Sequence, residues 1–196
     1  MNQFHRVLVS FDHQRVVKEL TEAGALFSEP EKRVAELLEG NDRHINIGHF
    51  DFKQSPYLLS WLSERGLSPD RMSVFVSKPL ESPTIWHKDG PKPMAAINVP
   101  WFGTAGTFTE WCPDSDLIEH VVLREDKSIQ RIEGEGYVIP AERVELHNKA
   151  IALSVSAFHR VFPTRASALR GILSIRFPNG FHYRELSEIL QKYDDK

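Results

Sequence analysis

Beyond Met72 the chain consists largely of short apolar segments that are separated by proline, glycine or aspartate. Runs of this length, bounded by residues that favour turns, are typical of β-strands. Several short strands at regular spacing predict a β-barrel or sandwich. The expected strands are 73–76, 84–86, 94–99, 106–111, 120–124, 137–139, 150–156 and 171–177, with a further apolar strand at 157–162.

The first third of the chain has a mixed pattern. A short apolar run at 6–11 indicates a strand, and Asp12 is placed to cap a helix that continues to Leu26. A second helical pattern covers 31–38. A third begins at Ser55, with proline in its first turn.

These patterns predict one domain over 1–196, because a single hydrophobic core can serve a chain of this size. Its fold class is mostly β with flanking helices. Residues 1–70 form a mixed α/β support, 72–178 form the β core, and 183–193 form a C-terminal helix. We see no linker that divides the chain.

Charge and cysteine content narrow the function classes. The net charge of −3 gives no electrostatic reason to expect a nucleic-acid partner or an acidic membrane. Cys112 is the one cysteine, so a disulfide within the chain is impossible and a reducing, cytoplasmic location is expected. We find no signal peptide and no apolar run long enough to cross a bilayer, so no membrane partner is expected.

His87 and Asp89 lie two residues apart, so on an extended segment both side chains project from the same side. Gly90 and Pro91 follow them and predict a turn that exposes the pair. His159 comes 70 residues after Asp89, which leaves room for several strands between them. Two histidines and one carboxylate are the ligand set that non-haem iron(II) oxygenases use to hold their metal on one face. We therefore predict a metal site at these three residues.

Other histidines fit the pattern less well. His120 has Arg131 eleven residues on, but only about thirty residues separate it from Asp89, and Arg131 falls in a segment that looks like a charged turn, 131–136. His147 has no arginine at the corresponding place. The remaining histidines lie outside the strand-rich part and are interpreted as surface or packing residues: His5, His13, His44, His49 and His182. A single cysteine disfavours a Cys/His zinc site.

The set His87-x-Asp89, His159 and Arg170 resembles the 2-oxoglutarate- and iron(II)-dependent oxygenases. The resemblance covers about 72–178. Ile-Asn-Val-Pro at 97–100 and Leu-Ser-Ile-Arg-Phe at 173–177 are similar to the corresponding segments of small members.

The resemblance implies a double-stranded β-helix of the jelly-roll or cupin type, with the metal between its two sheets. His87, Asp89 and His159 would hold Fe(II), leaving positions for 2-oxoglutarate and O₂. The expected activity is that of a dioxygenase, an oxidoreductase that forms succinate and CO₂ as coproducts. Because Asp89, the acid of the triad, is retained, the resemblance implies hydroxylation or a related oxidation rather than halogenation.

Arg170 is expected to bind the distal carboxylate of the cosubstrate, since a guanidinium fork offers that group two parallel hydrogen bonds. Arg176 lies on the same strand face and is a second candidate, for either cosubstrate or substrate. Its spacing from Arg170 also resembles the nucleic-acid demethylase branch. Asn98 lies in an apolar strand where a buried amide needs partners, and it is a candidate contact to the cosubstrate or a strand-end cap.

Several functions remain open within this interpretation. A small-molecule or amino-acid-type substrate is favoured, because the chain has no obvious peptide-binding or nucleic-acid-binding appendage. Oxidation of a nucleic acid or of a protein side chain by the same chemistry is the first alternative. A metal-binding β-barrel without redox chemistry is the second, although a plain metal site does not need Arg170. The sequence does not indicate the oligomeric state.

Overall fold

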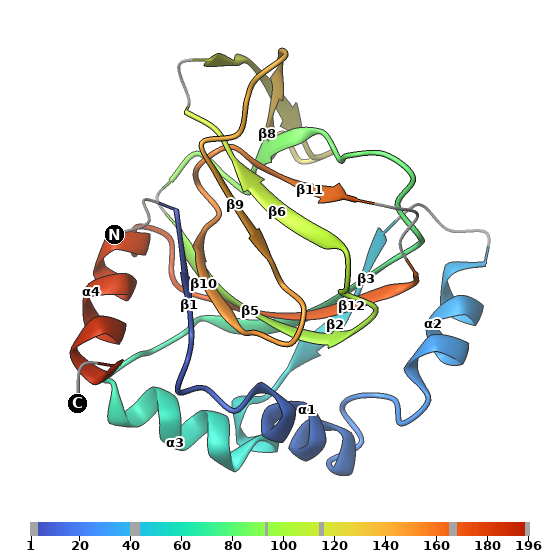
Figure 1. The fold of residues 1–196 in the computed structure, drawn as a ribbon, viewed down its shortest axis with the longest axis vertical. Helices are drawn as coiled ribbons and strands as arrows, with labels where there is room; N and C mark the ends of the chain where they lie inside the picture. Colours follow the sequence, from blue (N-terminus) through green and yellow to red (C-terminus); the bar gives the residue numbers. More distant parts are fainter. Residues whose placement is uncertain (1–3, 40–43, 93, 114–115, 165–167, 195–196) are drawn as a thin grey trace.

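Figure 1 shows the computed structural model of the chain, which describes residues 4–39, 44–92, 94–113, 116–164 and 168–194. Two antiparallel sheets of six strands each, accompanied by a few helices, make up the structure, so the predicted mostly-β class is confirmed. We call them sheet A and sheet B.

Neither sheet follows the order of the strands in the chain. Sheet A contains, from one edge to the other, β1 (His5–Val7), β10 (Ile151–Ser154), β5 (Ala95–Phe102), β12 (Arg170–Arg176), β3 (Arg71–Ser77) and β2 (His44–Phe50). Sheet B contains β7 (Ile118–Leu123), β8 (Ile129–Glu135), β4 (Trp86–Lys88), β11 (His159–Pro163), β6 (Thr107–Trp111) and β9 (Glu142–Glu145).

Successive strands alternate between the two sheets. From β3 to β6, and again from β9 to β12, each strand lies in the opposite sheet from the strand before it. As a result four strands of each sheet have matching orders, β3-β12-β5-β10 in sheet A and β4-β11-β6-β9 in sheet B. We call these eight the central strands, although β9 lies at the edge of sheet B. Between the two runs, β7 and β8 form a hairpin that extends sheet B beyond β4 and projects at the top of Figure 1.

Helices cover the outer face of sheet A. The helices are α1 (His13–Glu22), α2 (Pro30–Leu38), α3 (Pro56–Glu64) and α4 (Tyr183–Asp194), with a short 3₁₀ turn η1 (Phe52–Gln54). The predicted cap at Asp12 is confirmed, because its side chain accepts a hydrogen bond from the Arg15 amide at 3.0 Å. Ser55, where the third helix was expected to begin, accepts one from the Leu58 amide at 3.3 Å and caps α3. Within the described part of the chain, no helix is long and apolar enough to span a membrane.

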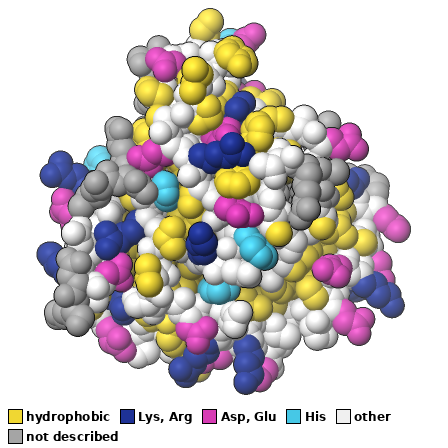
Figure 2. Space-filling model, in the orientation of Figure 1, with side chains coloured by type: hydrophobic (Ala, Val, Ile, Leu, Met, Phe, Trp, Pro, Cys, Tyr) yellow, Lys and Arg dark blue, Asp and Glu magenta, His cyan; other side chains and the backbone are white. Residues whose placement is uncertain are grey.

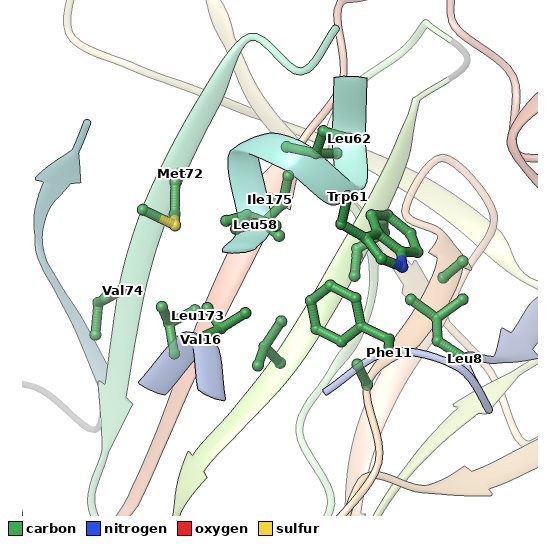
Figure 3. Packing of buried hydrophobic residues seen from close by; sticks show 14 of the residues in the cluster. Leu8, Phe11, Val16, Leu58, Trp61, Leu62, Met72, Val74, Leu173 and Ile175 are labelled. Atoms are coloured by element: carbon green, nitrogen blue, oxygen red, sulfur yellow. The ribbon is translucent and has the colours of Figure 1, made fainter. Parts of the chain in front are cut away.

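The main hydrophobic core lies between these helices and sheet A. Figure 3 shows Val16 of α1 and Leu58 of α3 packed against Val74, Leu173 and Ile175. These strand residues occupy one face of sheet A, so their neighbours in sequence point to the other face, toward sheet B. Since the apolar face packs against the helices, the side chains that alternate with these apolar residues along the strands lie on the face toward sheet B.

Some sequence-based expectations were wrong. Segment 137–139 is not a strand, and Tyr137 and Ile139 are 99% and 82% exposed. Arg131 lies in strand β8 rather than in a charged turn. Only one face of β8 is apolar. Its pairing with β7, the strand just before it, and with β4, which is distant in the sequence, makes it a strand.

Two further strands, β2 and β9, were not predicted, because their residues are largely polar. His5 and His49 consequently lie in strands of sheet A rather than outside the sheets. The predicted strand at 6–11 is shorter and ends at Val7.

Gly103 gives a testable case of close packing. Its φ is +63°, and a methyl group added there would lie 1.7 Å from the carbonyl oxygen of Leu169. Gly66 has a similar φ of +62° with nothing within 4 Å of the added atom. We expect Gly66→Ala to cost about 1–2 kcal/mol of unfolding free energy from backbone strain alone. Gly103→Ala should cost roughly 3–5 kcal/mol, because strain and steric overlap combine.

Thermal denaturation of both variants beside wild type measures this difference. Equal losses in the two variants would show that the approach of Leu169 to Gly103 does not constrain the fold.

Candidate metal centre

The three predicted ligands come together on adjacent strands of sheet B. His87 of β4 and His159 of β11 are directly paired across the sheet, and their ring centroids are 4.4 Å apart. Asp89 follows the end of β4, with its Oδ1 3.6 Å from Nε2 of His87. One potential ligand atom from each residue lies within 4.8 Å of the other two, so this cluster can hold a metal ion.

Both imidazole rings are held in one orientation by the backbone. Nδ1 of His87 donates to the carbonyl oxygen of Ile85 at 3.0 Å, and Nδ1 of His159 donates to that of Ala157 at 3.0 Å. A carbonyl oxygen only accepts hydrogen bonds, so Nδ1 carries the proton in each ring. Each Nε2 is then left with a lone pair to offer a metal. Metal-binding histidines are usually oriented in this way.

The electrostatic environment favours the protonation states that bind metals. Burial alone would raise the pKa of Asp89, but the charge of Arg176 and its hydrogen bond, with smaller contributions from the neighbouring histidines, hold that pKa well below its usual range. Burial, with the neighbouring His87 ring, lowers the pKa of His159 to about 4. At neutral pH the pair is therefore an ionised carboxylate and a neutral imidazole, the forms in which both residues bind a metal.

Arg176 lies against the proposed ligands rather than apart from them. Its Nη1 donates to Oδ2 of Asp89, and its guanidinium lies 5.8 Å from the ring centroid of Phe75. This contact occupies one carboxylate oxygen and leaves Oδ1 on the side of His87. The structure thus gives Arg176 a clear contact, the positioning of Asp89.

Arg170 is buried, and none of the described residues gives it a counter-charge. It is 8% exposed, and its Nε has no hydrogen-bond partner among the described residues. Burial lowers its pKa to about 10, which still leaves the guanidinium charged at neutral pH. A desolvated, unpaired charge is costly, so a protein rarely keeps one without a use.

Three further polar atoms on the same face of sheet A are buried, and no described residue forms a hydrogen bond with them. Ser77 is directly paired with Arg170 across β3 and β12, and Ser174 is paired with Asn98 across β12 and β5. Oγ of both serines and Oδ1 of Asn98 lack a hydrogen-bond partner among the described residues. Four unsatisfied groups on three neighbouring strands indicate a place for a polar ligand, since buried polar groups are normally hydrogen-bonded.

The sequence alone identifies Arg170 and Asn98 but not the two serines. Ser174 shares a strand face with Arg170, which is visible in the alternation of β12. Ser77 is linked to Arg170 only by the pairing of β3 with β12, nearly a hundred residues apart in the chain, and no local pattern gives that register.

Four of the other histidines have side-chain partners away from the cluster. His120 pairs with Glu135 at 3.0 Å and His49 with Ser73 at 2.8 Å, while the side chain of exposed His147 contacts Asn148 at 2.9 Å. His5 is buried, stacks on Trp111 and contacts Glu142 at 2.9 Å. None of them joins the cluster of His87, Asp89 and His159.

The pKa of His159 predicts acid sensitivity of the metal-free protein. The unfolded chain takes up a proton on this residue near its ordinary pKa of 6.5, whereas the folded protein does so only near 4. Stability is therefore lost as the pH falls from 6.5 toward 4, by up to about 3 kcal/mol. Chelator-treated protein should have a lower melting temperature at pH 4.5 than at pH 7, and His159→Asn should reduce that difference.

His147→Asn is the matched control, because His147 is exposed. An equal pH response in wild type and in both variants would contradict the assignment to His159.

Comparisons with known proteins do not assign the chain to a family. No family model matches the chain, and no curated protein matches it. Among solved structures, the chain is similar to the crystal structure of AviO1 from Streptomyces viridochromogenes Tue57, with 11% sequence identity, a TM-score of 0.42 and 88% of each chain covered. Function therefore has to be inferred from the geometry of the site itself.

Proposed function

We propose that this chain is a 2-oxoglutarate- and iron(II)-dependent dioxygenase that hydroxylates a small-molecule substrate. The observation that carries the proposal is Arg170, a buried guanidinium to which no described residue gives a counter-charge. It lies on the strand whose other end contacts the metal cluster through Arg176. A site for a metal alone gives no reason to bury such a charge. A cosubstrate with a carboxylate at each end gives a reason for both Arg170 and the cluster.

The strand order supports the finer fold that such an enzyme would have. Winding two antiparallel strands together into a double-stranded β-helix makes successive strands alternate between two sheets. The matching orders β3-β12-β5-β10 and β4-β11-β6-β9 have this alternation. We therefore propose that these eight strands form a double-stranded β-helix, with the hairpin β7–β8 as an insertion.

The metal cluster and the unpaired polar groups of sheet A match the groups that 2-oxoglutarate and its iron would present. His87 and His159 would bind the iron through Nε2, and Asp89 through the oxygen that Arg176 leaves open. Arg170, with Ser77 beside it, would receive the distal carboxylate as a charge-assisted pair. Ser174 and Asn98 lie between the two arginines along sheet A and would donate or accept hydrogen bonds there.

The iron would supply the activation of O₂: one oxygen atom enters succinate as 2-oxoglutarate loses CO₂, and the other converts a substrate C–H bond to C–OH. This chain's own residues bind and orient the reactants, and the two sheets exclude bulk water from them.

Succinate release tests the proposal directly. Purified protein supplied with iron(II), ascorbate and 2-oxoglutarate under air should form succinate, and omission of the iron should prevent it. Without O₂, the iron-loaded protein should develop a visible absorption band only when 2-oxoglutarate is added. A protein that binds the metal but gives neither the band nor succinate would be a metal-binding β-barrel without redox chemistry.

A further inference from the structure

The hairpin β7–β8 continues the metal-bearing face of sheet B beyond His87. His159 is paired with His87, His87 with Glu133 of β8, and Glu133 with His120 of β7. Directly opposed residues in antiparallel strands project from the same face, with Cβ atoms about 4.5–5.5 Å apart. Glu133 is therefore the neighbour of His87 on the side away from His159.

The residues on either side of Glu133 confirm which way it points. Ile132 packs with Trp86 and Phe158 in a hydrophobic cluster on the other face. Gly134 lies on that same face, since a methyl group there would lie 2.8 Å from the ring of Phe158. The alternation along β8 then places Glu133 on the face of the metal cluster.

One carboxylate oxygen of Glu133 accepts hydrogen bonds from Arg131, and the other accepts none from the described residues. Nε and Nη2 of Arg131 both donate to Oε1 of Glu133. Oε2 has no hydrogen-bond partner among the described residues, and the side chain is 23% exposed. Arg131 thus fixes the direction of the carboxylate while Oε2 stays available to a ligand.

Hydrophobic side chains gather on the projection at the top of Figure 2, and they lie on both faces of the hairpin. Val121 of β7 is opposite Ile132, on the face away from His87, whereas Ile118 is opposite Glu135, on the metal-bearing face. Beside His87, the metal-bearing face presents the carboxylate of Glu133. A group that meets this oxygen close to the metal must be a hydrogen-bond donor, and a cation satisfies it best.

We propose that Glu133 binds a cationic nitrogen of the substrate, which makes the substrate class a small primary amine or guanidine. This inference rests on the proposed function. The position of Glu133, one strand from His87, places the cationic nitrogen a few bonds from the carbon that is hydroxylated. Arg131 is a positioning residue, since it acts through the carboxylate of Glu133.

A substrate panel tests the inference. Succinate release above the substrate-free rate is measured with L-lysine, L-arginine and putrescine, beside the uncharged analogues L-norleucine and L-citrulline and the anionic L-glutamate. A mass increase of one oxygen atom identifies the hydroxylated product. We expect at least one cationic compound to stimulate succinate release, and its uncharged analogue to do so at least about tenfold less well.

Glu133→Gln is the diagnostic variant, because it keeps the shape and removes the charge. Its KM for the cationic substrate should rise about 10- to 100-fold, with a smaller change in kcat. Glu135→Gln is the matched control: Glu135 lies on the same strand face but is 77% exposed and paired with His120. The anaerobic absorption band, recorded for each variant, shows whether iron and 2-oxoglutarate still bind.

The outcomes separate the two proposals. Absence of both the band and succinate in wild type overturns the proposed function. If the band forms but no cationic compound stimulates turnover, or if citrulline serves as well as arginine, the role of Glu133 is wrong. An unchanged KM in Glu133→Gln also overturns it.

Discussion

Replacing Arg170 with methionine should weaken 2-oxoglutarate binding about 100-fold or more and, at the same time, make the ligand-free protein more stable. The first effect follows from the loss of two charge-assisted hydrogen bonds to a carboxylate, each worth about 1.5–3 kcal/mol. The second follows because the guanidinium is buried and has no counter-charge in the part of the chain that the structure describes. Methionine fills similar space without a charge, and should raise the free energy of unfolding by about 1–3 kcal/mol.

Melting temperatures with and without 2-oxoglutarate measure both effects in one experiment. Wild type should be stabilised by the cosubstrate, whereas Arg170→Met should start higher and respond little. Arg184→Met is the control, because Arg184 is 86% exposed on α4 and its partner among the described residues is Glu188, also on α4. A variant that is less stable than wild type and still responds to 2-oxoglutarate would show that Arg170 has a structural role.

Replacing His159 with alanine should abolish stoichiometric metal binding and lower succinate release by more than about 100-fold. Loss of a residue that merely orients a metal ligand typically costs 10–100-fold, and loss of the ligand itself should exceed that. Metal content after dialysis against iron(II) or manganese(II), with circular dichroism as a check on folding, provides the measurement. His147→Ala is the control, because His147 is exposed and lies outside the cluster. Full metal content in His159→Ala would remove this residue from the site.

The sequence was sufficient for the parts of the site that depend on local geometry. The spacing of His87 and Asp89 requires only that one strand be extended, and the fold brings His159 to them as predicted. The caps at Asp12 and Ser55 were equally readable, because a helix start depends on neighbouring residues.

The parts that were missed depend on register between distant strands. Glu133 is beside His87 only because β8 pairs with β4, and Ser77 is beside Arg170 only because β3 pairs with β12. A one-residue shift in either pairing would turn these side chains to the opposite face of the sheet. The sequence of one strand alone does not determine its register with a distant partner strand. Polar strands such as β9 were also missed, since their pairing rather than their composition makes them strands.

The alternation of strands between the two sheets also has a kinetic consequence. Central strands that are consecutive in the chain never pair with each other, so almost every contact in the sheets joins distant segments, and β7–β8 is the one tight hairpin among the described strands. Proteins dominated by such non-local contacts fold slowly, because the entropy of closing long loops is lost before the contacts form. His87 and His159 are 72 residues apart and meet only through β4 and β11. A metal ion added during refolding should therefore be captured late, after the two sheets have closed.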